Sequence, residues 1–159
     1  MSKTNYSFEF FPPRTTEGEE KLKTTVKKLS VFNPEFFSVT FGAGGSTKDK
    51  TIETVKSIKE VGFCAVPHIS CITSTKDEVL KLIQDYQNKG INRLVALRGD
   101  NPSGIAGHGD FSHASDLVSF VRENTGEYFH IDVAAYPEYH PESVGAKNDL
   151  KNFKTKDAS

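Results

Sequence analysis

The sequence predicts an α/β fold in which short strands of a parallel sheet alternate with helices. Five apolar segments begin at residues 7, 36, 64, 93 and 130, so their starts lie 29, 28, 29 and 37 residues apart. This spacing is close to one βαβ step. Most of the segments are apolar on both faces, which is typical of a parallel sheet buried on both sides.

We expect strands at Ser7–Phe11, Phe36–Phe41, Cys64–Ser70, Arg93–Arg98 and His130–Tyr136. Capping boxes predict three helix starts, at Thr16 with Glu19, Ser46 with Asp49, and Thr75 with Glu78. The third helix should end at Asn88-Lys89-Gly90, where the glycine can form a C-cap. A fourth helix is expected at about Ser112–Arg122, and a fifth from about Ala146. The side chains expected to face the core are Leu22, Val26, Leu29, Ile52, Val55, Ile58, Val79, Leu82, Ile83, Tyr86, Ala114, Leu117, Val118 and Val121.

Five successive units are compatible with a doubly wound open sheet or with part of a (β/α)8 barrel. A complete barrel needs about 250 residues, and the chain has 159. No GxGxxG follows the first strand and no GxxxxGK[ST] occurs in the sequence, so a nucleotide-binding open sheet lacks its usual phosphate loops.

The composition argues against binding to nucleic acid or to a membrane. The 20 basic and 21 acidic residues give a net charge of -1, and no run reaches the ~18 apolar residues of a membrane span. Cys64 and Cys71 do not form a CxxC pair, and with one nearby histidine they make a poor zinc site. We expect a reduced, soluble, cytoplasmic protein.

Glu9 is the carboxylate that stands out, because the strand around it consists mostly of phenylalanine. An ionised carboxylate in apolar surroundings is costly, so it pairs with another group or takes a raised pKa, or both. A carboxyl whose pKa approaches neutrality suits a general acid. The alternative is an edge position with the side chain in water.

Polar residues and glycines lie at or just after the carboxyl ends of the other strands, where ligand sites of parallel sheets assemble. They are Thr40 with Gly42–Ser46, then His68, then Arg98-Gly99-Asp100, and finally Tyr136–His140. The first three groups have ordinary alternatives: a flexible turn, a hydrogen-bonded core histidine, and a structural Arg98–Asp100 ion pair. We assign no chemistry to His108 and His113.

A metal-hydrolase site is a second alternative, with Glu9, His68, Asp100 and His140 as nitrogen and oxygen ligands. The first strand carries no HxH pair, and no helix carries HExxH. We therefore predict no metal site.

The chain resembles the methylenetetrahydrofolate reductase family, which are flavoproteins with a (β/α)8 barrel. The resemblance rests on five motifs in family order: Ser7–Arg14, Ser38–Ser46, Pro67-His68, Ala96–Asp100 and Ala134–Glu142. It covers essentially the whole chain, and it implies a barrel truncated to about its first five βα units. We expect residues 1–159 to be the N-terminal part of a single (β/α)8 barrel domain, with no second domain.

The resemblance implies that NAD(P)H reduces bound FAD, and that reduced flavin then converts 5,10-methylenetetrahydrofolate to 5-methyltetrahydrofolate in methionine biosynthesis. By the same resemblance Glu9 is the acid that opens the methylene bridge, and Asp100 lies near both flavin and pterin. The positions implied to bind FAD are Thr40, Phe41, Ala43, His68, Arg98, Gly99, Asp100, Ala114, Tyr136, His140, Asp149, Asn152 and Lys156. The choice between NADH and NADPH stays open.

The chain departs from the family pattern in three respects. Phe41 stands where many members carry tyrosine, and Thr155 where a basic residue often holds the cofactor. The family also continues through three more strands after the point where this sequence ends. We therefore keep a second interpretation, a catalytically silent fragment or subunit that needs a partner chain to complete the site. Its apolar edge strands could pair with strands of another chain, either a different protein or a second copy in a homo-oligomer.

Overall fold

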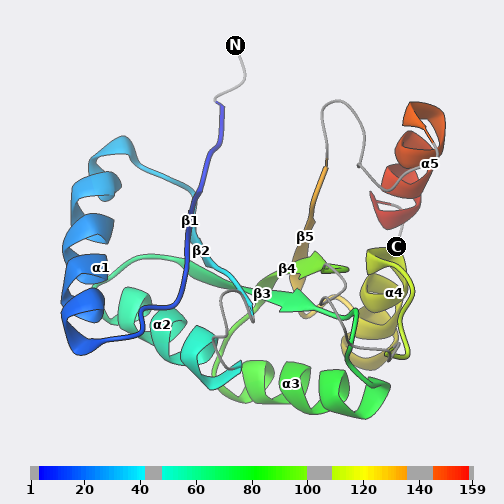
Figure 1. Cartoon of the computed structure of the whole chain (residues 1–159), viewed down its shortest axis with the longest axis horizontal. Helices are drawn as coiled ribbons and strands as arrows, with labels where there is room; N and C mark the ends of the chain where they lie inside the picture. The colour runs from blue at the N-terminus through cyan, green and yellow to red at the C-terminus, as the bar shows by residue number, and fades with distance from the viewer. Residues whose placement is uncertain (1–3, 42–47, 100–108, 136–144, 158–159) are drawn as a thin grey trace. The chain divides into compact units, whose positions relative to one another are not determined.

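The structure is a computed structural model that describes residues 4–41, 48–99, 109–135 and 145–157. Strands and helices alternate along the chain, as Figure 1 shows, which confirms the predicted α/β class. The chain divides into two compact units, Met1–Ile69 and Ser70–Ser159. Each unit is described by itself below.

Unit 1 contains three parallel strands in chain order and two helices. Its elements are β1 (Phe8–Phe10), α1 (Thr16–Leu29), the 3₁₀ turn η1 (Ser30–Phe32), β2 (Phe37–Val39), α2 (Lys48–Glu60) and β3 (Ala65–Ser70), which reaches the boundary of the unit. β1 pairs with β2, and β2 pairs with β3. Helix α1 contacts α2, and α2 contacts β2.

Aromatic and branched side chains form the core of unit 1. The Phe37 ring lies 6.0 Å from the Phe8 ring, 5.8 Å from the Phe10 ring and 5.8 Å from the Phe63 ring. Val26 of α1 and Val55 of α2 are fully buried. The phenylalanine-rich start of the chain therefore packs as one face of the sheet.

Unit 2 contains two parallel strands and three helices. Its elements are α3 (Lys76–Asn88), β4 (Arg93–Leu97), α4 (Ala114–Thr125), β5 (His130–Val133) and α5 (Ala146–Asp157). β4 pairs with β5 along four residues, and α4 contacts β4. An Arg93–Asp132 ion pair with nitrogen–oxygen distances of 2.7 and 2.9 Å links the two strands.

The expected apolar stripes are confirmed in all four helices that carry them. Leu22, Val26, Ile52, Val55, Ile58, Val79, Ile83, Tyr86, Ala114, Leu117, Val118 and Val121 are buried, while Leu29 and Leu82 are partly exposed. The Thr75–Glu78 capping box is also confirmed, with Thr75 N–H donating to the Glu78 carboxylate over 2.9 Å. Gly90 follows the end of α3 with a φ of 65°, as expected of a glycine that terminates a helix.

Several predicted boundaries were wrong. The N-cap of α1 is Thr15, whose hydroxyl accepts from Gly18 N–H over 3.1 Å, and not Thr16. Helix α4 begins at Ala114 and not at Ser112, because the Asp116 carboxylate accepts from Ser112 and His113 N–H and holds both in the cap. All five strands are at least one residue shorter than predicted at one end or both; β4, for example, ends at Leu97 instead of Arg98. Ser46 lies outside the described residues.

None of the described helices is long and apolar enough to cross a membrane.

Candidate functional site

Strand register brings polar side chains of unit 1 to one face of its sheet. Glu9 of β1 is in register with Ser38 of β2, which is in register with Val66 of β3. Alternate residues of a strand share a face. Thr40 and His68, two positions beyond Ser38 and Val66, therefore lie on the same face as Glu9. The carboxyl ends of three strands thus present an acid, a hydroxyl and an imidazole together.

Glu9 and His68 contact each other on this face. His68 Nε2 lies 3.6 Å from Glu9 Oε2, and the side chains are 6% and 55% exposed respectively. Burial lowers the pKa of His68, while the negative charge of Glu9 acts in the opposite direction. The imidazole is therefore neutral near pH 7, where it can donate or accept a hydrogen bond without bringing a positive charge to the carboxyl.

The expectation that Glu9 lies in apolar surroundings was wrong. Phe8 and Phe10 point to the opposite face, toward Phe37, because successive side chains of a strand alternate. Glu9 is accordingly exposed for more than half of its side chain. The structure instead supports the alternative, a side chain largely in water, with His68 Nε2 as a neighbour 3.6 Å away.

Thr40 is buried at the end of β2, and its backbone and its side-chain hydroxyl differ in how they are bonded. Its backbone is well held: Thr40 N–H donates to Phe10 C=O over 3.0 Å, and Thr51 Oγ1 donates to Thr40 C=O over 2.9 Å. The Thr40 Oγ1 atom, in contrast, has no hydrogen-bond partner in the part of the chain that the structure describes. Buried polar atoms without a partner are rare, and a bound ligand is one explanation for them.

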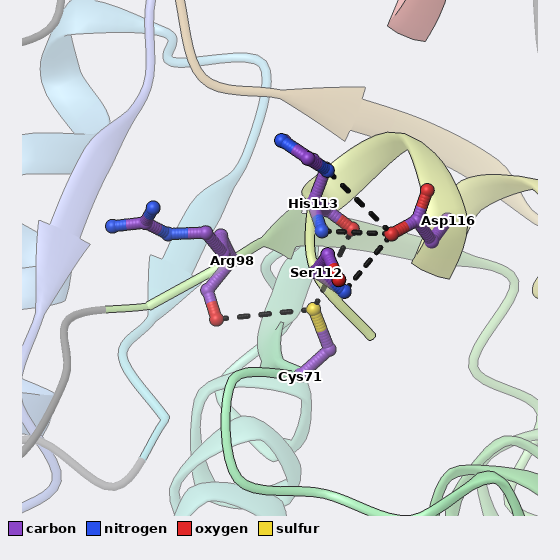
Figure 2. A network of polar contacts seen from close by, with 5 residues as sticks. All are labelled: Cys71, Arg98, Ser112, His113 and Asp116. Carbon is purple, nitrogen blue, oxygen red and sulfur yellow. Dashed lines mark hydrogen bonds and ion pairs between the residues drawn. The ribbon is translucent and has the colours of Figure 1, made fainter. Parts of the chain in front are cut away.

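Unit 2 fixes the backbone of Arg98 directly after β4. The Arg98 carbonyl accepts hydrogen bonds from Ser70 Oγ over 3.1 Å and from Ile72 N–H over 2.8 Å. Cys71 Sγ lies 3.8 Å from this carbonyl and 3.8 Å from the His113 carbonyl. Figure 2 shows the Arg98 guanidinium directed away from Cys71, and its Nε donates to Gly99 C=O over 3.2 Å.

Gly99 must be glycine because of both its backbone and its neighbours. Its φ of 85° is in the left-handed region, and a Cβ at this position would lie 2.1 Å from Ser70 Oγ. Gly99 can therefore lie this close to Ser70 only because glycine has no Cβ. Ala114, another predicted cofactor contact, is buried in the first turn of α4.

Most of the remaining predicted site residues lie in parts of the chain that the structure does not describe. Ala43, Asp100, Tyr136 and His140 lie outside the described residues, as do the side chains of Asp149, Asn152, Thr155 and Lys156 within α5. Phe41 is described and is partly exposed, directly after Thr40. Among the described residues no group of three histidine, cysteine or acidic side chains could hold a metal ion. Two of the four ligands in the metal alternative, Asp100 and His140, are not described.

Sequence reasoning missed Ser38 and Asp116. Ser38 is buried, and it lies in register between Glu9 and the strand that carries His68. The signal was present, since Ser38 and Thr40 alternate with apolar residues in β2 and so mark a polar face. Asp116 could have been read as a capping residue three positions after His113.

A groove of unit 1 lies away from these residues, between α1 and α2. Its lining is Pro13, Glu19, Leu22, Lys50, Glu53, Thr54 and Ser57. None of these residues was predicted to take part in chemistry.

Comparison with known proteins identifies relatives along nearly the whole chain. A model of the family described as methylenetetrahydrofolate reductase matches residues 1–158. A 5,10-methylenetetrahydrofolate reductase of Salmonella typhimurium is 48% identical over 153 residues, which are 96% of this chain and 50% of the relative. The protein of the same name from Escherichia coli gives the same identity and coverage.

A plant relative is more distant. The Arabidopsis thaliana protein named methylenetetrahydrofolate reductase (NADH) 1 is 38% identical over 152 residues, which are 92% of this chain and 26% of the relative. The chain spans about half the length of the curated bacterial relatives it matches.

Proposed function

Because the chain belongs to the methylenetetrahydrofolate reductase family, we propose that it serves a flavin-dependent reduction of 5,10-methylenetetrahydrofolate to 5-methyltetrahydrofolate with NAD(P)H. The family is one of oxidoreductases, and the described alternation of strands and helices is that of the first five βα units of its (β/α)8 barrel. We propose further that residues 1–159 are part of one barrel domain.

The observation that supports this proposal most is the face of unit 1 that carries Glu9, Thr40 and His68. An acid, a neutral imidazole and a hydroxyl without a hydrogen-bond partner among the described residues lie at the carboxyl ends of neighbouring parallel strands. Sites of parallel α/β folds are built at this end of the strands. The same three residues belong to the motifs on which the family resemblance rests.

The described residues fit a flavin in two ways. The buried Thr40 hydroxyl, which lacks a partner among the described residues, can bond a polar edge of the cofactor. The backbone of Arg98 is anchored, and its guanidinium, whose Nε donates to Gly99 C=O over 3.2 Å, carries a positive charge that suits the anionic part of FAD. When bound, FAD supplies the carrier that accepts a hydride from NAD(P)H and from which the folate is reduced. The residues proposed to contact it are Thr40, Phe41, Ala43, His68, Arg98, Gly99, Asp100, Ala114, Tyr136, His140, Asp149, Asn152 and Lys156.

Glu9 is proposed as the general acid for the folate. A proton on its carboxyl, delivered to a nitrogen of the methylene bridge, helps that bridge open to the reactive iminium form of the substrate. Its half-exposed side chain leaves it accessible to a ligand on this face. Asp100 is proposed, on the resemblance alone, to hydrogen-bond the pterin.

The wider setting of the proposal is one-carbon metabolism and methionine biosynthesis. Cys64 and Cys71 are both free thiols, which agrees with a reducing compartment such as the cytoplasm. NADH and NADPH both remain candidates as the reductant, and the plant relative is named for NADH.

A second candidate function is that of a silent partner in a larger assembly. Its support is coverage, because the chain corresponds to about half of its bacterial relatives. In that case a second chain would complete the site, and this chain by itself would bind FAD weakly and turn over poorly.

Purifying the chain in the presence of FAD, and then testing it for bound flavin and for turnover, distinguishes the enzyme from the silent partner. The enzymatic proposal predicts a yellow protein with flavin absorbance that oxidises NAD(P)H when menadione is the electron acceptor. A colourless protein without turnover would favour the silent partner. The Glu9→Gln variant should keep any menadione reaction, because flavin reduction by NAD(P)H needs no acid at the folate. Loss of that reaction in Glu9→Gln would contradict the role given to Glu9.

A further inference from the structure

The Glu9–His68 contact crosses a strand. Glu9 extends from β1 and His68 from β3, with β2 between them. Neighbouring strands lie about 4.8 Å apart, so the two backbones are roughly 10 Å apart and only long side chains can meet. The 3.6 Å between Nε2 and Oε2 therefore requires both side chains to be directed toward each other.

Ser38 makes this contact possible. It is the β2 residue in register with Glu9, and it lies on the same face as both partners. Its side chain is small, so it leaves space above β2 for the Glu9 carboxyl to reach β3. A branched side chain at this position would fill that space.

We propose that His68 is a positioning residue for Glu9, holding the carboxyl over β2 and directing it to the ligand face of the sheet. The inference rests on the proposed function, since it adds a second residue to the acid that acts on the folate. A separation of 3.6 Å is longer than a hydrogen bond, and such contacts often tighten when a ligand closes the site.

The charge state of His68 suits this role. Its burial favours the neutral imidazole, and among the described residues Glu9 is the charged group that acts on its titration. A protonated His68 would hold Glu9 as a carboxylate, which cannot donate a proton. A neutral His68 can orient the carboxyl and still allow it to carry one.

The first test is a histidine titration by NMR on the chain without FAD or folate. The five histidines of the chain should give separate imidazole signals, and the signal that is missing from the spectrum of His68→Gln belongs to His68. In Glu9→Gln the pKa of His68 should fall below that of the wild type, because the charge that raises it is gone. Glu20→Gln, the same charge change on α1, should leave His68 unmoved. An unchanged His68 in Glu9→Gln would overturn the proposal.

Ser38→Val gives an independent variant in which both titrating groups remain. If Glu9 reaches His68 over Ser38, this substitution should lower the pKa of His68 as Glu9→Gln does. A folded Ser38→Val protein with the wild-type titration would contradict the crossing geometry. Circular dichroism shows whether each variant is folded.

The second test follows the Glu9 carboxyl, which a merely structural histidine would not affect. Nuclear Overhauser contacts between the Glu9 side-chain methylene protons and the Ser38 β protons report whether the carboxyl is held over β2. These contacts should weaken in His68→Leu and return toward the wild type in His68→Gln, whose polar amide can take the place of the imidazole. Identical contacts in all three proteins would refute a positioning role. Both tests need no flavin, whereas FAD binding by the wild type tests the proposed function separately.

Discussion

His68 shows how burial of one titratable side chain should affect the stability of the whole chain. Its pKa is lowered in the folded protein from the ordinary value of 6.5, chiefly by burial. The unfolded chain therefore binds a proton more readily than the folded one in the pH range just below 6.5. The contribution of neutral His68 to stability is complete above that range and is lost as the pH falls through it.

We therefore predict that the free energy of unfolding falls between about pH 7.5 and about pH 5, and that His68→Gln reduces this slope. Urea denaturation at both pH values measures the difference. A slope that is the same in the wild type and in His68→Gln would show that His68 is not the group responsible.

Cys64 and Cys71 should differ sharply in reactivity. Cys71 is fully buried, and burial together with the nearby Asp116 raises its pKa to about 11, whereas Cys64 is exposed. Because the thiolate is the reactive form, one thiol per chain should react promptly with DTNB at about pH 8. The Cys64→Ser variant should show no prompt reaction until denaturant is added. Prompt labelling of Cys64→Ser would mean that Cys71 is accessible.

At the scale of the element, the two threonines before α1 give a direct test of its cap. Thr15 accepts a hydrogen bond from Gly18 N–H, and Thr16 is the first helical residue. Loss of an N-cap side chain costs about 1 kcal/mol. Thr15→Ala should therefore destabilise the chain by that amount in urea denaturation, while Thr16→Ala should have a much smaller effect. A larger loss of stability in Thr16→Ala than in Thr15→Ala would show that Thr16 is the N-cap residue, as the sequence pattern predicted.

The helices were more predictable than their ends. Apolar residues at helical spacing identified the buried stripes, since this spacing follows directly from helix geometry. The cap of α1 was displaced by one residue because Thr15 and Thr16 are adjacent, and the Glu19 spacing fitted the wrong one. Strand ends were overestimated since a residue belongs to a ladder only where the neighbouring strand also extends, as at Phe8–Phe10 against Phe37–Val39.

The sequence was enough to name residues of the candidate site, but it did not predict what surrounds them in the fold. Glu9, Thr40 and His68 were singled out from the sequence, and the strand register brings them to one face. That Glu9 faces away from Phe8 and Phe10 follows from the alternation of side chains along a strand, but whether its own face meets apolar side chains or solvent depends on the neighbouring strands, which local sequence does not specify. The contact with His68 over Ser38 is likewise a property of three strands together.

At the scale of the whole molecule, the account depends on a claim about unit 1. The face that carries Glu9, Thr40 and His68 is proposed as part of the flavin site, in a chain that belongs to the methylenetetrahydrofolate reductase family. Thr40 offers the cleanest variant, because its hydroxyl has no partner among the described residues. Replacing such a hydroxyl costs the fold little, so a loss of binding would not reflect unfolding.

The deciding measurement is an FAD titration of the wild type, Thr40→Val and Thr24→Val, followed by flavin fluorescence. The account predicts that the wild type binds FAD and that Thr40→Val binds about tenfold more weakly, which is about 1.4 kcal/mol, or one hydrogen bond. Thr24, an exposed threonine of α1 that bonds the Glu20 carbonyl, provides the matched control, and its variant should bind like the wild type. No FAD binding by the wild type, or equal affinity in all three proteins, would contradict the claim.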